Sequence, residues 1–330
     1  GLDQLRDDAR FAELDGRGLS VVVIDTGIDV DHSFFGPDAD GDGVADRIVF
    51  QYDFADDDSD ATTSSAHGSH VSGIIASEDA VYTGVAPGVD LIQLKVFSDS
   101  GIGYTSYLEE ALSWVYEHAA EYNIAAVNLS LGDGRNWRTA GGHYGLDDEL
   151  AALASLGIIT VSAAGNRYGA YDTAPGLSYP AADPNSVSVG AVWDADRGGP
   201  WQFREGATDY TSAADRIASF SQRHATLLDV FAPGLVITSA DANGGVTAMR
   251  GTSMASPFVA GAAVLAQQMA LDQFGRLLAP AEFRSLLQAA SAPIFDGDDE
   301  DDSVANTQAS YGRLDLLALA KAVWNYDASS

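Results

Sequence analysis

The chain of 330 residues contains no cysteine and only two lysines, Lys95 and Lys321. The absence of cysteine excludes disulfide bonds and zinc sites with thiolate ligands, but it leaves the redox compartment open. No stretch approaches 18 uninterrupted apolar residues, so we expect no membrane-spanning helix. Because 46% of the residues are hydrophobic, the chain can still bury the core of a single large α/β domain.

Basic residues are scarce as a class: 17 stand against 48 acidic residues, and the formal net charge is −31. A surface of this sign disfavours nucleic acids and anionic membranes as partners, because both are negatively charged. It gives a weak hint of basic peptides instead. Two interpretations remain open, an ordinary soluble acidic surface and an adaptation to high salt, in which ions screen the repulsion between carboxylates.

Short apolar runs alternate with segments typical of helices. Continuous rather than alternating hydrophobicity suits strands covered on both faces, and we expect such strands at 20–24, 91–97, 125–131, 158–163 and 186–192. We expect helices at about 67–77, 105–121, 146–156, 253–270, 280–290 and 313–325. This alternation predicts an α/β fold with a doubly wound, mainly parallel central sheet and helices on both faces. We find no internal repeat or linker, so we predict one domain over 1–330, with surface insertions near 36–64, 193–218 and 295–308.

Four polar residues stand at the ends of these expected elements, where open α/β sheets form their sites. Asp25 follows the strand VVVI, His67 opens HGSHVSG, Asn166 ends SAAGN, and Ser253 lies in RGTSMASPFVAG. Hydrolysis of an amide needs a nucleophile, a base, a group that orients the base and a donor for the oxyanion, and these four residues offer one of each. Taken singly, each also suits a turn, a loop or a helix cap.

His70 follows His67 by three residues and could form a metal-binding pair with it. A hydrolase that uses a metal at this pair would need further ligands, and none stands nearby in the sequence. We therefore interpret His70 as a structural residue.

The motifs HGSHVSG and GTSMASPFVAG, in this order after IDTGID, resemble those of the subtilisin-like serine proteases. The resemblance runs from about residue 18 to 325 and includes GVAPGVDLIQLKVF and LDVFAPG. It implies that Ser253 is the nucleophile, that His67 is the general base, that Asp25 orients the base, and that Asn166 binds the oxyanion with the Ser253 backbone N–H.

The resemblance also implies where a polypeptide substrate binds. Two segments would lie on either side of the substrate main chain and hold it as an added strand: Gly101, Ile102, Gly103 and Ser130, Leu131, Gly132. The first specificity pocket should be lined by residues after Leu131 and Asn166.

The segment DADGDGVAD carries carboxylates at Asp38, Asp40, Asp42 and Asp46, and follows the start of an EF-hand-like calcium loop. Val44 would contribute its backbone carbonyl. The usual glutamate at the twelfth position is replaced by Val49, so Asp46 would carry more of the coordination. Hard oxygen ligands at this density favour Ca²⁺ as a structural ion, and an acidic turn without an ion is the alternative.

Two further acidic clusters could bind cations, but we interpret both as solvated acidic faces. They are Asp53, Asp56, Asp57, Asp58 and Asp60, and the run from Asp296 to Asp302.

The leading hypothesis is a secreted, calcium-stabilised serine endopeptidase that works as a monomer; a cytoplasmic location is the alternative. The chain begins at Gly1 without a signal segment, so we expect a processed form whose N-terminal propeptide has been removed. A processing protease or peptide ligase with the same triad is one alternative. A non-catalytic calcium-binding protein on a degenerate protease fold is another, but no member of the triad is missing.

If the acidic surface is an adaptation to salt, the melting temperature should rise from low to molar NaCl, because ions screen the repulsion among the carboxylates. Thermal unfolding followed by circular dichroism would measure it. A melting temperature that falls over the same range would leave only the interpretation of an ordinary acidic surface.

Overall fold

The computed structural model describes residues 1–297 and 301–327, apart from the side chain of residue 205. Within them, one nine-stranded sheet has the order β12-β13-β9-β6-β5-β4-β1-β3-β2. Neighbouring strands run parallel throughout, except that β12 and β13 are antiparallel. The strands are β1 (Ser20–Asp25), β2 (Ile48–Asp53), β3 (Asp90–Lys95), β4 (Ile124–Leu129), β5 (Ile159–Ala163), β6 (Ser186–Val192), β9 (Val230–Pro233), β12 (Ala292–Phe295) and β13 (Ser310–Arg313).

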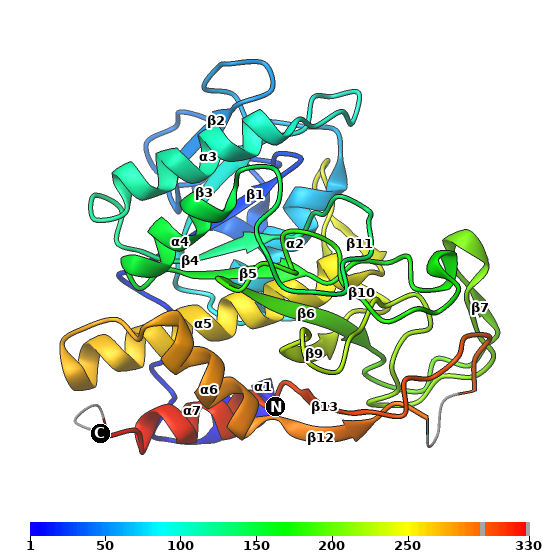
Figure 1. Cartoon of the computed structure of the whole chain (residues 1–330). Helices are drawn as coiled ribbons and strands as arrows, with labels where there is room; N and C mark the ends of the chain where they lie inside the picture. Colours follow the sequence, from blue (N-terminus) through cyan, green and yellow to red (C-terminus); the bar gives the residue numbers. More distant parts are fainter. Residues whose placement is uncertain (298–300, 328–330) are drawn as a thin grey trace.

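Helices cover both faces of this sheet, which confirms the predicted doubly wound α/β fold (Figure 1). Two small antiparallel hairpins lie outside it, β7 (Trp201–Gln202) with β8 (Thr208–Asp209) and β10 (Ile237–Ala240) with β11 (Val246–Met249). The helices are α1 (Leu2–Asp7), α2 (Ala66–Ala76), α3 (Thr105–His118), α4 (Asp147–Ser155), α5 (Thr252–Phe274), α6 (Pro280–Ala290) and α7 (Leu316–Trp324).

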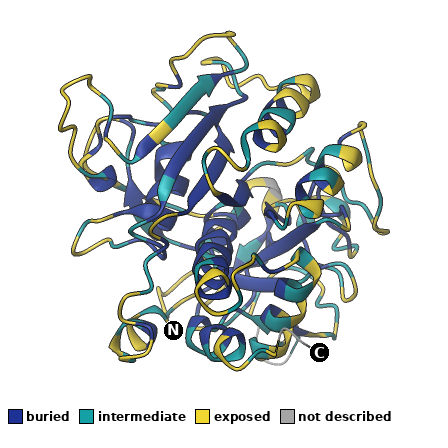
Figure 2. Ribbon diagram, turned by 90° about the vertical axis from the view of Figure 1, so that its left-hand side faces the viewer, coloured by how far each residue is buried: buried dark blue, intermediate teal, exposed yellow. Residues whose placement is uncertain are grey.

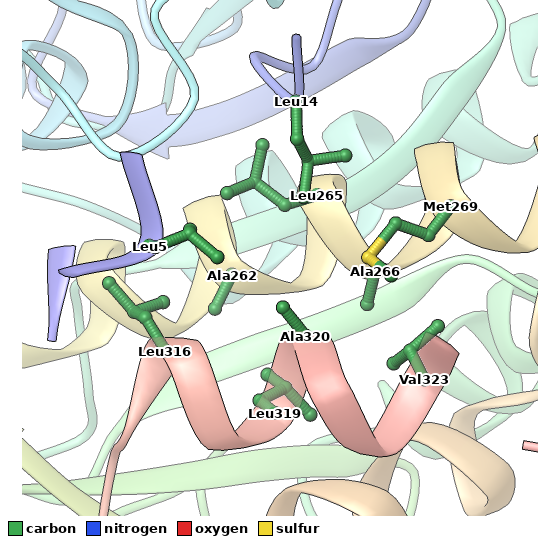
Figure 3. Close-up of a pocket in the computed structure, with 10 residues that line it drawn as sticks. All are labelled: Leu5, Leu14, Ala262, Leu265, Ala266, Met269, Leu316, Leu319, Ala320 and Val323. Atoms are coloured by element: carbon green, nitrogen blue, oxygen red, sulfur yellow. The ribbon is translucent and has the colours of Figure 1, made fainter. Parts of the chain in front are cut away.

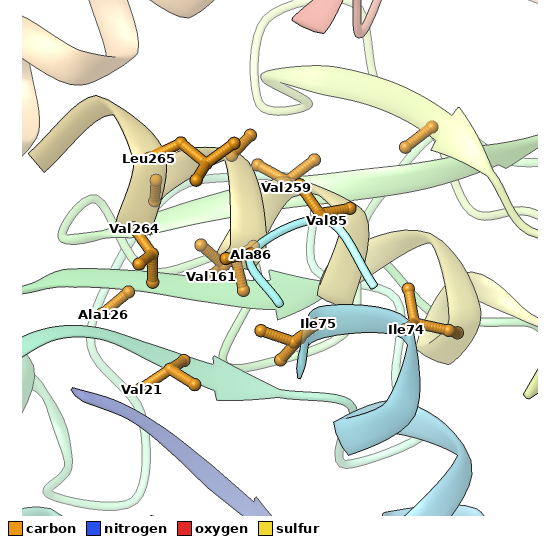
Figure 4. Packing of buried hydrophobic residues seen from close by; sticks show 14 of the residues in the cluster. Val21, Ile74, Ile75, Val85, Ala86, Ala126, Val161, Val259, Val264 and Leu265 are labelled. Carbon is orange, nitrogen blue, oxygen red and sulfur yellow. The ribbon is translucent and has the colours of Figure 1, made fainter. Parts of the chain in front are cut away.

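Alternate residues of the central strand β1 enter two separate cores. In β1, Val21 and Val23 pack with α2 and α5, whereas Val22 and Ile24 pack with α3 and α4. Figure 4 shows the first of these cores, where Val21, Ala126 and Val161 of the sheet face side chains of α2 and α5. Both faces are therefore apolar, which is why the strands read as continuous hydrophobic runs.

Helix α5 lies at the centre of the molecule. It is long and apolar enough to cross a membrane, but 83% of its most apolar 18-residue window is buried in the protein, as in a core helix. In Figure 2 the central strands and the innermost helix are mostly dark blue, while peripheral helices show yellow outer faces. On its outer side α5 packs against α7 and the N-terminal segment, and leaves a void of only about 10 Å³ (Figure 3). This contact is a packed interface and offers no room for a ligand.

The three expected insertions contribute more to the fold than surface loops would. Strand β2 lies in the middle of the segment 36–64 and forms an edge of the main sheet, so these six residues are part of the sheet and not a surface insertion. Segment 193–218 folds into the β7–β8 hairpin, and Asp209 of that hairpin forms a bridge with Asp302 of segment 295–308. Residues 298–300 of the latter segment lie outside the described residues.

Helix α2 reaches the end of β1 through a contact between backbones. A Cβ atom on Gly68 would stand 1.9 Å from the carbonyl oxygen of Gly27, closer than any side chain can lie. Gly27 itself has φ +102°, and a Cβ atom on it would stand 2.4 Å from the Ala61 carbonyl oxygen. The glycines therefore let α2 start directly beside the carboxyl end of β1.

We predict that Gly68→Ala destabilises the protein by about 1–3 kcal/mol, because the new methyl group must push α2 away from β1. Gly141→Ala is the matched control, since a Cβ there meets nothing within 4 Å and should change stability by less than about 0.5 kcal/mol. Urea unfolding of both variants measures the difference. Equal stability of the two variants would contradict this account.

Candidate active site

Asp25 and His67 meet at the carboxyl end of β1. The Asp25 side chain is only 1% exposed, and its Oδ1 accepts hydrogen bonds from His67 Nδ1 at 2.6 Å and from the Thr26 backbone N–H at 2.7 Å. The Thr26 hydroxyl in turn accepts the Gly68 N–H at 3.1 Å, in the first turn of α2. This end of the strand therefore holds both the carboxylate and the start of the helix that carries the imidazole.

The hydrogen bond to Asp25 leaves Nε2 as the basic nitrogen of His67. Burial alone would lower the pKa of His67, but the negative charge of Asp25 and its hydrogen bond outweigh burial, so the pKa lies above its usual value. The imidazole side chain remains 31% exposed. It can thus accept a proton and keep the resulting charge next to a carboxylate.

Ser253 and Asn166 come together around the N-terminus of α5. Asn166 Oδ1 accepts the Thr252 backbone N–H at 2.8 Å and the Thr252 hydroxyl at 2.9 Å, which turns the Nδ2 group of Asn166 away as a donor. A Cβ atom on Gly251 would stand 3.3 Å from Asn166 Nδ2 and 3.7 Å from Ser253 N, so the two donors flank Gly251. Two N–H groups next to a hydroxyl can stabilise an oxyanion that forms there.

Buried polar side chains tie the start of α5 to the end of β4. The Ser130 hydroxyl donates to the Ser253 carbonyl at 2.7 Å and accepts from Asn128 Nδ2 at 2.9 Å, while Asn128 Oδ1 accepts from the Ser256 hydroxyl at 2.8 Å. We expected Ser130 only beside the substrate, and the sequence pattern gave no sign of this second contact. Thr252 and Asn128 were likewise missed, because isolated polar residues in core segments do not reveal their partners.

The described residues include no hydrogen bond between His67 and the Ser253 hydroxyl. Helices α2 and α5 nevertheless pack against each other, and both residues belong to the first turns of these helices. Catalytic hydrogen bonds are often long before substrate binds. The lack of a hydrogen bond between His67 and Ser253 here is therefore compatible with proton transfer between them once a substrate is bound.

The two expected substrate segments line one cavity of about 340 Å³, to which Gly103, Leu131 and Gly132 contribute. Ile102 is 52% exposed, and Gly101 adopts φ +78° in the turn that precedes it. Strand β4 ends one residue before Ser130. The structure thus brings the two segments together as neighbours.

Asp133 lies in the wall of the same cavity and was not singled out from the sequence. Burial would raise its pKa, but hydrogen bonds from the Arg135 N–H, the Trp137 indole, the Tyr179 N–H and the Ser178 hydroxyl outweigh burial and lower it. The ionised carboxylate therefore joins two loops that border the cavity.

The position of His70 agrees with a structural role. Its Nε2 donates to the Ile237 carbonyl at 2.9 Å, and burial lowers its pKa to about 4. His67 Nδ1 is hydrogen-bonded to Asp25 instead. Because each of these two nitrogens already has its own partner, they do not form a metal-binding pair with each other.

The carboxylate oxygens of Asp38, Asp40 and Asp42 lie within 4.8 Å of one another. Hydrogen bonds from the Gly43 N–H, and then from the Gly41 and Asp42 N–H groups, lower the pKa of Asp38. The Asp46 carboxylate accepts the Ala39 N–H across the loop. Three of the five expected ligands therefore fit a hard cation, while Asp46 faces the loop backbone.

The interpretation of the other two acidic clusters as solvated faces was wrong for the first residue of each, Asp53 and Asp296. Asp53 is 2% exposed and pairs with Lys95, whose ammonium group also contacts Asp99 at 3.1 Å. Asp296 is fully buried and pairs with Arg223 Nε at 2.9 Å. Cations of the chain itself neutralise both carboxylates. Residues 298–300 of the second cluster lie outside the described residues.

Comparison with known proteins shows which family the chain resembles. Residues 16–313 match the Subtilase family. The chain is 35% identical to Alkaline serine exoprotease A of Vibrio alginolyticus over 78% of its own length and 40% of the relative's. It is 33% identical to Subtilisin E of Bacillus subtilis over 80% of its length and 60% of the relative's, and 29% identical to Intracellular serine protease of Paenibacillus polymyxa over 89% and 80%. Against the first two of these relatives, the chain spans about half of their length.

A solved structure supports the same relationship. The crystal structure of a cold adapted subtilisin-like serine proteinase superposes with a TM-score of 0.65 at 30% identity, and covers 92% of this chain and 91% of that protein. The family match covers most of the chain and includes the segments that carry Asp25, His67, Asn166 and Ser253. The chain therefore belongs to the subtilase family.

Proposed function

We propose that the chain is a serine endopeptidase that hydrolyses peptide bonds through an acyl-enzyme on Ser253. The observation that carries the proposal is the 2.6 Å hydrogen bond between His67 and the buried carboxylate of Asp25. Membership of the subtilase family supports it. The roles of the four residues follow from their chemistry.

In the acylation step the Ser253 hydroxyl oxygen attacks the carbonyl carbon of the scissile bond, and His67 Nε2 takes the hydroxyl proton. The charge that develops on the carbonyl oxygen is stabilised by Asn166 Nδ2 and the Ser253 N–H. The C–N bond then breaks, and the proton on His67 passes to the leaving amine. Water repeats these transfers on the ester and releases the acid, while Asp25 keeps His67 in the tautomer that serves both steps.

The Asn166 amide is held ready for this role before substrate binds. Because the Thr252 N–H and hydroxyl both bond to Oδ1, the amide cannot rotate freely, and the cost of orienting a donor is already met in folding. We therefore assign Thr252 as a positioning residue. The peptide would lie as a strand between 101–103 and 130–132.

We predict that Ser253→Ala abolishes casein hydrolysis and that Asn166→Ala lowers kcat about 100- to 1000-fold, the loss known for an oxyanion donor of a subtilisin. Ser285→Ala on the exposed side of α6 is the matched control and should retain full activity. Circular dichroism shows whether each variant is folded. A folded Ser253→Ala variant that hydrolyses casein at the wild-type rate would refute the proposal.

We further infer that a calcium ion stabilises the loop 38–46. Asp38, Asp40 and Asp42 would hold it, with the Val44 carbonyl and Asp46 as additional candidates, and the ion would offset the repulsion among these carboxylates. The exposed loop without a bidentate glutamate suits a weak site, of the kind found in extracellular proteins. This favours the secreted location, although one relative is named an intracellular protease.

We predict that EGTA lowers the melting temperature and the activity of the wild type, because the carboxylates lose their counter-ion. The double variant Asp40→Asn, Asp42→Asn should no longer respond to calcium, whereas Asp3→Asn, Asp7→Asn on α1 removes two exposed charges elsewhere and should respond as the wild type does. Calorimetric unfolding with calcium and with EGTA measures the response. Identical unfolding in both buffers would exclude the ion.

A further inference from the structure

An open pocket of about 620 Å³ lies next to the proposed oxyanion donors. Asn166 and Gly251 line it together with the segment Gln202, Phe203, Arg204. It contains three of the 17 basic residues of the chain, Arg167, Arg204 and Arg250. Such a concentration is unexpected in a protein of net charge −31.

Two of these arginines have no ion-pair partner in the described part of the chain. Arg204 and Arg250 are both exposed and form no ion pair there, whereas the guanidinium groups of Arg10, Arg47 and Arg276 each hold a carboxylate. In a chain with almost three acidic residues for each basic one, nearby carboxylates are easily available as partners. Arg204 and Arg250 are thus left to bind an external anion.

Arg250 is also held in place. Its guanidinium carbon lies 5.7 Å from the ring centroid of Trp201 and 5.8 Å from that of Phe203, within the range of cation–π attraction. These contacts restrict the side chain without neutralising its charge. Arg167 differs, because it stacks near Tyr171 and donates to the Gly134 carbonyl, so the argument does not depend on it.

The position of the pocket identifies which part of a substrate enters it. The cavity of about 340 Å³ is lined by both segments that would hold the substrate main chain, including Gly103 and Leu131. The arginine pocket is lined by neither segment, and it begins at Gly251, two residues before Ser253. If the residues before the scissile bond lie along the first cavity, the arginine pocket on the other side of Ser253 is left for the residues after that bond.

We propose that Arg204 and Arg250 bind the carboxylate of an aspartate or glutamate in the first two residues after the scissile bond. This inference rests on the proposed endopeptidase function and adds a substrate class to it, peptides with an acidic leaving part. Guanidinium groups bind carboxylates through two parallel hydrogen bonds, which a lysine could not reproduce. This preference is opposite to the basic substrates that the overall charge would favour. Contacts within the pocket act at short range and are screened less by salt than the field of the whole surface, so we expect them to decide the preference.

The test compares quenched fluorescent peptides that differ only by aspartate or asparagine at the first or second position after the cleaved bond. The wild type should cleave the better aspartate peptide with a kcat/KM about fivefold higher than its asparagine counterpart, the size expected for an exposed ion pair. The double variant Arg204→Gln, Arg250→Gln should bring this ratio to about one, and Arg250→Glu should lower it further. Arg10→Gln removes the same charge at a distant exposed site and should keep the wild-type ratio.

A ratio near one for the wild type, or a ratio that the double variant leaves unchanged, would overturn the inference while the endopeptidase function stands. A wild type that cleaves none of the peptides and no casein would overturn the proposed function and this inference together. Mass spectrometry of a digested protein gives an independent readout, since acidic residues should be enriched after the cleavage sites of the wild type and lose that enrichment in the double variant.

Discussion

The contact between Gly68 and the Gly27 carbonyl is the constraint on which the rest of the site depends. It sets the distance between the end of β1 and the start of α2, and with it the distance between Asp25 and His67. A hydrogen bond of 2.6 Å that an imidazole N–H donates to a buried carboxylate requires its two partners to be held by rigid elements. The sheet and the helix supply that rigidity because both are packed on two sides, and the glycines remove the atoms that would keep them apart.

The other half of the site depends on side-chain hydrogen bonds between α5 and the strands beneath it. Thr252 holds Asn166 after β5, and Ser130 after β4 holds the carbonyl of Ser253. Each strand end is thereby fixed to the same helix turn. Side-chain hydrogen bonds are stronger where water is excluded. Removing one partner of such a bond leaves the other buried group without a hydrogen bond, which costs stability. The geometry around Ser253 is thus a property of the core as much as of the surface.

The central part of this arrangement could be predicted from the sequence, because β1, β3, β4, β5 and β6 consist mainly of apolar and small residues and several candidate residues stand at or just after strand ends. Strand β2 was missed because its short run IVFQY stands between two acidic stretches, and the whole of 36–64 was therefore interpreted as one insertion. The short strands β9, β12 and β13 lack enough residues to show a period. The burial of Asp53 and Asp296 was missed for a related reason: their partners, Lys95 and Arg223, lie 42 and 73 positions away, and a local pattern of acidic residues contains no information about such distant cations.

The burial of Lys95 gives this protein an unusual chemical surface. The side chain of Lys95, on the strand β3 next to β1, is 2% exposed, and Asp53 neutralises its ammonium group. Reagents that acylate amines therefore cannot reach it in the folded protein. The other lysine, Lys321, lies on α7, which packs along the far part of α5 up to Met269, about 24 Å along the helix from Ser253 at 1.5 Å per residue. Covalent coupling through lysine would therefore attach the protein by the side remote from its site. Labelling of Lys95 would in turn report the opening of the sheet beside Asp25.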